Sequence, residues 1–356
     1  MNGITHSSWR LTEADLRAWL RGLLDVGTVI APVEQDGVLS FRRITSAGQA
    51  VIEPSGKTRW SPKEFLFPRS EALYRYTFTG AAVRLEDPPL PEERQVLFGV
   101  RSCDASGLAR LDEIFLGGTP DRRYAARREN TTLVSAVCAS ADPECFCTAV
   151  GYSPVGEQGC DAQLAPIDGG WLLRVLTEKG RDLVGDHAGP WTAATAGDDG
   201  RLPEIEKAVS GQIRKRPVSR EWSRILERGF GHEVWERLVP QCQGCGLCAY
   251  VCPSCSCFDM NHEANSWCGQ QCRSWDACTF AAFTRHASGH NPRGSKQARY
   301  RQRVLHKFAF REDEDGPFRC VGCGRCVALC PAGIDIVDTA TAAVEAIGEE
   351  GAGVAR

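Results

Sequence analysis

The chain has 356 residues, a formal net charge of −3 at pH 7, and contents of 42% hydrophobic and 24% charged residues. These values are typical of a globular protein of two to three domains, and they give no reason to expect the whole molecule to bind nucleic acid. The exception is cysteine, because 18 cysteines are far more than an ordinary cytosolic enzyme carries.

So many thiols indicate either a disulfide framework in a secreted protein or a set of metal ligands in a reducing compartment. Residues 1–22 have scattered charges and no apolar run of signal-peptide length, so export is not expected. No stretch of about 18 apolar residues occurs, so no transmembrane helix is expected. We therefore expect a cytoplasmic protein that does not associate with membranes and whose clustered cysteines bind metal.

The first segment has the pattern of a mixed α and β domain. Thr12 and Asp15 form a capping-box pattern ahead of apolar residues at helical spacing, which predicts a helix. Residues 28–33 and 38–44 are β-rich runs separated by Asp36-Gly37, which predicts a hairpin.

Two short apolar runs further along each lead to a cysteine. Residues 95–100 predict a buried strand, followed by Cys103 in a turn and then a helical pattern, and residues 131–137 predict a second strand that ends on Cys138. Ligands collect at the carboxyl ends of strands in α/β sheets. With Cys145 and Cys147 close behind, these four thiols could hold an iron–sulfur cluster, which would be the third beside the two derived below, but they could also be buried free thiols or a zinc site.

The remaining predicted elements suggest how the chain divides into domains. Residues 171–177 predict a strand, 186–202 a linker or surface loop, 220–238 a helix interrupted by two glycines, and 334–356 a helical tail. We expect an α+β protein with an N-terminal α/β domain at 1–230. A helical, bacterial two-cluster ferredoxin-like module follows at 231–340, with an insert at 258–315, and residues 341–356 form a C-terminal tail.

The strongest motif is a cysteine run that occurs twice. The spacing C-x2-C-x2-C-x3-C-P is met at Cys242, Cys245, Cys248, Cys252 and Pro253, and again at Cys320, Cys323, Cys326, Cys330 and Pro331. In bacterial ferredoxins this run holds a 4Fe-4S cluster with its first three cysteines, while the fourth ligates the other cluster. This predicts a first cluster on Cys242, Cys245, Cys248 and Cys330, and a second on Cys252, Cys320, Cys323 and Cys326.

The residues around these cysteines suit such loops. Gly244, Gly246, Gly322 and Gly324 supply a permissive backbone that lets three thiolates face one cube. A proline after the fourth cysteine stops a helix from continuing. A zinc site is the alternative, but zinc requires two C-x2-C pairs and not triplets with a distant fourth ligand.

Between the two runs lie several stretches that simple ferredoxins do not have, at residues 252–260 (CPSCSCFDM), 274–278 (SWDAC), 289–293 (GHNPR) and 299–308 (RYRQRVLHKF). Together with residues 99–115, 124–130 and 138–147, they resemble the dicluster iron–sulfur subunit family. In cytosolic NAD(P)-linked NiFe hydrogenases, or sulfhydrogenases, the member of this family is the beta subunit, and anaerobic sulfite reductase has an equivalent iron–sulfur subunit. The likeness covers roughly residues 95–338 and also favours the third cluster.

The resemblance implies a non-catalytic relay subunit between a flavin-containing NAD(P)H-oxidoreductase subunit and a NiFe hydrogenase catalytic subunit. The equivalent subunit of anaerobic sulfite reductase is the alternative. An iron–sulfur or zinc protein that regulates by binding nucleic acid, and a stand-alone enzyme with an active site in the N-terminal domain, are further hypotheses. No Ser/His/Asp set or carboxylate pair indicates a catalytic site.

Other residues leave alternatives open. Cys255, Cys257 and Cys278, with Cys268 and Cys272 between them in the chain, could ligate another cluster, but we favour packing of Cys255 and Cys257 against the first cube. Cys160 is expected to be structural. The basic stretch 285–311 could bind phosphates, but cations beside a negatively charged cluster are the better explanation. His286, His290 and His306 lie in this stretch and are not expected to be ligands.

Overall fold

The structure is a computed structural model that describes residues 7–52, 56–310 and 316–353. The chain divides into two compact units. Unit 1 consists of residues 1–66, 91–215 and 321–323, and unit 2 of residues 67–90, 216–320 and 324–356. Both units combine helices with strands, which confirms the α+β class. Whether 1–230, 231–340 and 341–356 fold as separate domains stays a prediction.

Unit 1 is built on an eight-stranded mixed sheet with the order β10-β1-β9-β8-β7-β6-β2-β3. Its strands are β1 (Ser8–Leu11), β2 (Thr28–Gln35), β3 (Val38–Arg43), β6 (Gln95–Val100), β7 (Thr131–Ala136), β8 (Ala162–Ile167), β9 (Gly170–Val175) and β10 (Thr192–Ala193). The central strands β2, β6, β7 and β8 run parallel, and the outer pairs are antiparallel.

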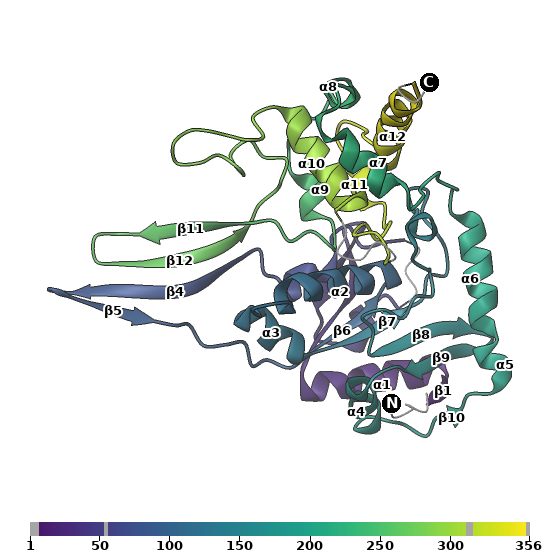
Figure 1. Ribbon diagram of the computed structural model, residues 1–356. Coiled ribbons are helices and arrows are strands. Elements are labelled where there is room, and N and C mark those ends of the chain that lie inside the picture. Colours follow the sequence, from purple (N-terminus) through teal and green to yellow (C-terminus); the bar gives the residue numbers. More distant parts are fainter. Residues whose placement is uncertain (1–6, 53–55, 311–315, 354–356) are drawn as a thin grey trace. The chain divides into compact units, whose positions relative to one another are not determined.

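Helices cover both faces of this sheet, as the complete burial of β6 requires. They are α1 (Glu13–Val26), α2 (Ser102–Leu116), α3 (Arg122–Glu129), α4 (Glu178–Gly185), α5 (Ala196–Asp199) and α6 (Arg201–Gln212), with 3-10 turns at Ala47–Gln49, Pro62–Phe65 and Cys147–Val150. Trp19 of α1 packs edge-to-face on Phe98 of β6, with 5.8 Å between the ring centroids. Figure 1 shows α2 and α3 over β6 and β7.

Most of the elements predicted for this part of the chain are confirmed. The side chains of Thr12 and Asp15 form the capping box of α1, and Asp36 and Gly37 both have positive φ, as in a type I′ hairpin turn between β2 and β3. The structureless loop predicted at 186–202 is wrong in part, because this segment contains β10 and α5. β10 pairs with β1, far away in the chain, and sequence periodicity does not register such a pairing.

Unit 2 contains a group of packed helices. They are α7 (Trp222–Arg228), α8 (Val234–Leu238), α9 (Leu247–Tyr250), α10 (Lys296–Phe308), α11 (Arg325–Ala328) and α12 (Ile336–Gly353), with a 3-10 turn at Gly229–Gly231. Trp222 and Phe308 join α7 to α10 edge-to-face at 5.7 Å. The interrupted helix predicted at 220–238 and the helical tail are confirmed, except that residues 354–356 of the tail lie outside the described residues.

A four-stranded antiparallel sheet completes unit 2, with the order β11-β12-β4-β5. Its strands are β4 (Ser70–Thr79), β5 (Ala82–Glu86), β11 (Phe258–Ala264) and β12 (Cys268–Trp275), and Figure 1 shows them as two extended hairpins. The pairing of β4 with β12 brings residues 67–90 into this unit. The predicted module was only helical, so this sheet is an addition that the sequence pattern did not indicate.

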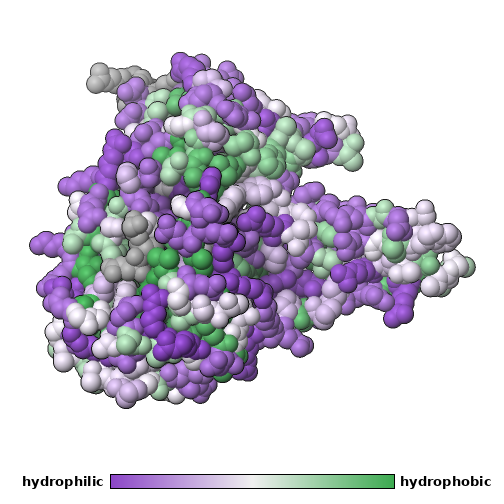
Figure 2. Space-filling model, turned by 180° about the vertical axis from the view of Figure 1, so that it is seen from behind, coloured by the Kyte–Doolittle hydropathy of each residue, from purple (hydrophilic) through white to green (hydrophobic). Residues whose placement is uncertain are grey.

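The surface shows no continuous apolar belt on the face drawn in Figure 2, where hydrophilic residues predominate and hydrophobic patches lie between them. Among the described residues, no helix combines the length and apolar character needed to cross a membrane.

Candidate iron–sulfur sites

The predicted ligands of the first cluster surround one cavity in unit 2. Its lining includes Cys242, Cys245, Cys248 and Cys330. Three of these come from the first run and the fourth from the end of the second, so the fold brings together the set that the ferredoxin pattern predicts. Gly244 and Gly246 have positive φ and turn the backbone tightly ahead of α9.

The donor chemistry of this cavity suits an iron–sulfur cluster. Every cysteine of the chain is a free thiol, so the four sulfurs are available as thiolate ligands. The only cationic side chain among the lining residues is that of Arg303, which is 2% exposed and whose Nε has no hydrogen-bond partner in the described structure. A buried cation without an anion is unfavourable, and a thiolate-ligated cluster would supply the missing negative charge.

The predicted ligands of the second cluster are divided between the units. Cys252, Cys320 and Cys326 belong to unit 2, whereas Cys323 is in the short segment 321–323 of unit 1. Cys252 and Cys320 are both 8% exposed. A hydrogen bond from Cys255 holds the pKa of Cys252 well below its usual value and against the effect of burial, as a thiolate ligand requires. Their coordination of a second cluster stays a prediction.

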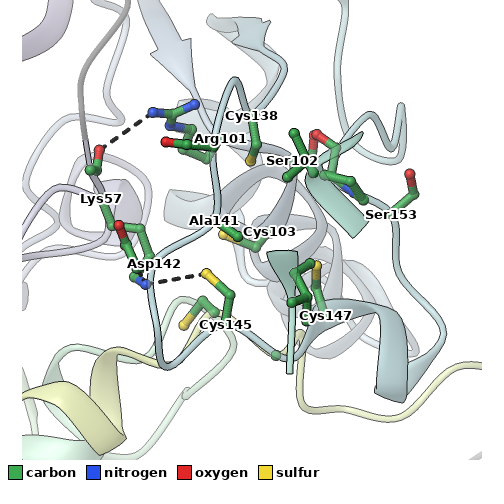
Figure 3. Close-up of a pocket in the computed structure, with 17 residues that line it drawn as sticks. Lys57, Arg101, Ser102, Cys103, Cys138, Ala141, Asp142, Cys145, Cys147 and Ser153 are labelled. Atoms are coloured by element: carbon green, nitrogen blue, oxygen red, sulfur yellow. Dashed lines mark hydrogen bonds and ion pairs between the residues drawn. The ribbon is translucent and has the colours of Figure 1, made fainter. Parts of the chain in front are cut away.

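The four cysteines of the possible third cluster also line one cavity, which is in unit 1. Figure 3 shows Cys103, Cys138, Cys145 and Cys147 around it. Cys138 is the second residue after β7. Cys103 is the second residue of α2 and so lies in the first turn of the helix, whereas the sequence placed it in the turn that precedes the helix. Because β6 and β7 are parallel neighbours, their carboxyl ends meet at one edge of the sheet.

Lys57 and Asp142 bring opposite charges to the cavity of the third ligand set. The Lys57 ammonium contacts the Asp142 carboxylate at 2.5 Å and donates a hydrogen bond to the Cys145 sulfur at 3.3 Å. Burial alone would lower the pKa of Lys57, but the charges of Cys145 and Asp142 raise it, so the ammonium stays charged. Burial and then the neighbouring thiols raise the pKa of Cys147 to about 12. Positive charge in the cavity would reverse this effect, as metal binding does.

The second cysteine run touches the rim of this cavity within unit 1. The Phe146 N–H donates a hydrogen bond to the Gly322 carbonyl at 2.9 Å, and Cys323 is among the residues that line the cavity. Gly322 has φ of +66°, and a Cβ at this position would lie 2.4 Å from the Cys147 backbone. Only glycine fits such an approach. The predicted third ligand set therefore lies beside a predicted ligand of the second cluster.

Other cysteines gather beside Cys252. Cys255 and Cys278 are 5% and 6% exposed, and they form hydrogen bonds with Cys252 and Cys257 respectively. Cys255 therefore packs against Cys252, a predicted ligand of the second cluster, and its packing with Cys257 against the first cluster stays a prediction. Cys272 is buried within β12, Cys268 is exposed, and Cys160 is buried as expected of a structural residue.

Only some of the cationic side chains in the basic stretch 285–311 lie at the surface. Arg299, Arg303 and Lys307 are between 2% and 6% exposed and lie on one side of α10 at intervals of four residues. Buried side chains cannot meet a phosphate backbone, which weakens the nucleic-acid hypothesis. Burial and then the charge of Lys307 lower the pKa of His306 to about 4, while His286 and His290 form an exposed ring pair. Arg311 lies outside the described residues.

Sequence reasoning missed Lys57 and Asp142, which lie in loops and belong to no motif. It found Arg303 and Lys307 only as members of a charge run. Within the described ranges, no three His, Cys, Asp or Glu side chains converge as closely as ligands of a single metal ion do.

Comparison with known proteins agrees with the geometry. Residues 241–334 match the 4Fe-4S dicluster domain family. The chain is also 30% identical over 316 residues to the sulfhydrogenase 2 subunit beta of Pyrococcus furiosus, and the match covers 88% of this chain and 92% of that relative. The resemblance stated from the motifs is thus confirmed over nearly the full length, and the chain belongs to the sulfhydrogenase beta-subunit family of iron–sulfur proteins.

Proposed function

We propose that this chain is the electron-transfer subunit of a hydrogenase complex. It carries electrons between a flavin-containing subunit that reacts with NAD(P)H and a NiFe catalytic subunit. The observation that supports this most directly is the first cavity, where cysteines of both ferredoxin runs meet. The clusters, when bound, supply one-electron carriers. The chain's own residues supply thiolate ligands, a buried setting and fixed positive charges.

Three ligand sets are proposed in this subunit. The first is Cys242, Cys245, Cys248 and Cys330, the second is Cys252, Cys320, Cys323 and Cys326, and the third is Cys103, Cys138, Cys145 and Cys147. The close approach of Gly322 to the Cys147 backbone supports a path for electrons from the third set to the second. The two swapped cysteines join the second set to the first.

Affinity purification of the intact complex through a tag on this chain tests the function. We expect a NiFe large subunit and a flavin subunit to copurify, identified by mass spectrometry together with nickel and flavin analysis. A sirohaem protein in their place would support the anaerobic sulfite reductase alternative. A chain that is recovered alone from native cells would contradict the relay role.

Metal analysis of a double variant tests the third ligand set. The wild-type chain is expected to contain about twelve irons and twelve sulfides, as three 4Fe-4S clusters require. Cys138→Ala with Cys147→Ala is expected to lower both counts to about eight, because it removes two of the four proposed ligands. Cys160→Ala, at another buried thiol of unit 1, is the matched control and should leave about twelve. A wild-type count of eight would contradict the third set.

A further inference from the structure

One side of helix α10 carries three cations into the interior of unit 2. Arg299 is occupied with backbone, because it donates hydrogen bonds to the carbonyls of Thr279, Arg293 and Gly294. Arg303, one turn further along, donates a hydrogen bond to the Cys255 sulfur, and Lys307, two turns along, donates to Ser254 and is acted on by the charges of Cys252 and Cys320. Within the described part of the chain, neither of them forms an ion pair with a carboxylate.

Arg303 faces cysteines of both ferredoxin-type ligand sets. It lines the cavity of the first set, and the charges that act on it include Cys248 of that set and Cys252 and Cys326 of the second. Its Nη1 donates to the Cys255 sulfur at 3.7 Å, and Cys255 in turn forms a hydrogen bond with Cys252. One buried guanidinium therefore lies close to ligands of both sets.

Lys307 faces the second set alone. Its Nζ donates to the Ser254 hydroxyl at 2.9 Å and to the Ser254 carbonyl at 3.2 Å. The same hydroxyl lies 3.5 Å from the Cys252 sulfur, and the charges near Lys307 include Cys252 and Cys320. Among the described residues, Arg303 lines the cavity of the first set and Lys307 does not.

Arg303 therefore lies close to ligands of both sets, whereas Lys307 lies close to ligands of the second set. Reduction adds negative charge to a cluster, and a fixed cation in a low-dielectric interior favours the more negative state. We propose that Arg303 is a shared redox-tuning residue that raises the reduction potentials of both ferredoxin-type clusters, whereas Lys307 raises the potential of the second cluster alone. The inference rests on the first two ligand sets of the proposed function.

Redox titrations of the purified complex followed by EPR test this proposal, with each signal assigned from its loss in Cys245→Ala or Cys320→Ala. Arg303→Met keeps the length of the side chain and removes its charge. It is expected to decrease the equilibrium constant for reduction of both clusters at least tenfold, which corresponds to about 59 mV for a one-electron couple. Lys307→Met is expected to affect the second cluster only, and Arg303→Lys to restore most of the shift.

Arg301→Met is the matched control, because Arg301 lies on the same helix but stacks on Phe230, at 3.9 Å from the ring centroid. It should leave both potentials unchanged. Two normal signals with unshifted potentials in Arg303→Met, or an equal shift in Arg301→Met, would overturn the inference. If Arg303→Met does not fold, a Lys307→Met protein whose two potentials are both unchanged would also overturn it. A wild-type protein without two 4Fe-4S signals would instead overturn the ligand sets themselves, and the inference with them.

Discussion

Replacing Cys330 with alanine is expected to abolish the same 4Fe-4S EPR signal that Cys245→Ala abolishes, although the two residues belong to different runs. Both line the cavity of the first ligand set, so each substitution leaves one iron without its thiolate. We expect the loss of at least one and up to four irons per chain. EPR of the dithionite-reduced protein, with iron and sulfide analysis, measures both effects.

Two further substitutions make this result specific. Cys320→Ala should abolish the other signal and spare the first, because Cys320 belongs to the second ligand set. Cys268→Ala should change neither signal, because this exposed thiol belongs to no proposed ligand set and donates a hydrogen bond to the Asn265 side chain. If Cys330→Ala and Cys320→Ala lost the same signal, the exchange of the fourth ligands would be disproved.

Gly322→Ala is expected to lower the free energy of unfolding by at least about 2 kcal/mol and to remove iron from the third ligand set. The cost arises first from a left-handed backbone conformation, which disfavours any residue with a Cβ. It arises further because that Cβ would lie 2.4 Å from the Cys147 Cα and backbone nitrogen, which cannot rotate away. Thermal unfolding should occur about 4–8 °C lower.

Gly118→Ala separates the two causes. Gly118 is in unit 1 and has a similar φ of +57°, but nothing lies within 4 Å of its Cβ position. This variant should show only the smaller conformational penalty and keep all of its iron. If both variants lowered the unfolding temperature equally and Gly322→Ala kept all of its iron, the close approach of Gly322 to Cys147 would contribute neither to stability nor to the third ligand set.

The sequence was sufficient for the parts of the site that follow from local spacing. The two ferredoxin runs predict their own ligand exchange, and the structure places Cys330 and Cys242 around the same cavity, as that pattern requires. Cys103 and Cys138 could be brought together by reasoning, because each follows a buried strand and parallel strands end at a common edge. In both cases a short motif determines the position of the sulfur.

The remainder depends on contacts that a linear pattern does not contain. Strand β12 is largely polar, and its partner β4 lies about 190 residues earlier in the chain, as in the pairing of Gly269 with Tyr76. Lys57 reaches Cys145 from a loop 88 residues away. In α10 the sequence shows a run of charges, but only packing determines that Arg303 and Lys307 are buried while Arg301 stacks on an exposed ring.

The position of Cys330 at the first cavity also affects when, during synthesis of the chain, the first ligand set is complete. The ribosome completes Cys242, Cys245 and Cys248 about 80 residues before it reaches Cys330. At about 5–20 residues per second, three thiols wait roughly 4–16 s for the fourth. With the proposed ligand sets, complete ligation of the first cluster follows synthesis of Cys330, and a message truncated between codons 252 and 320 would encode a chain that lacks one ligand of the first set and three of the second.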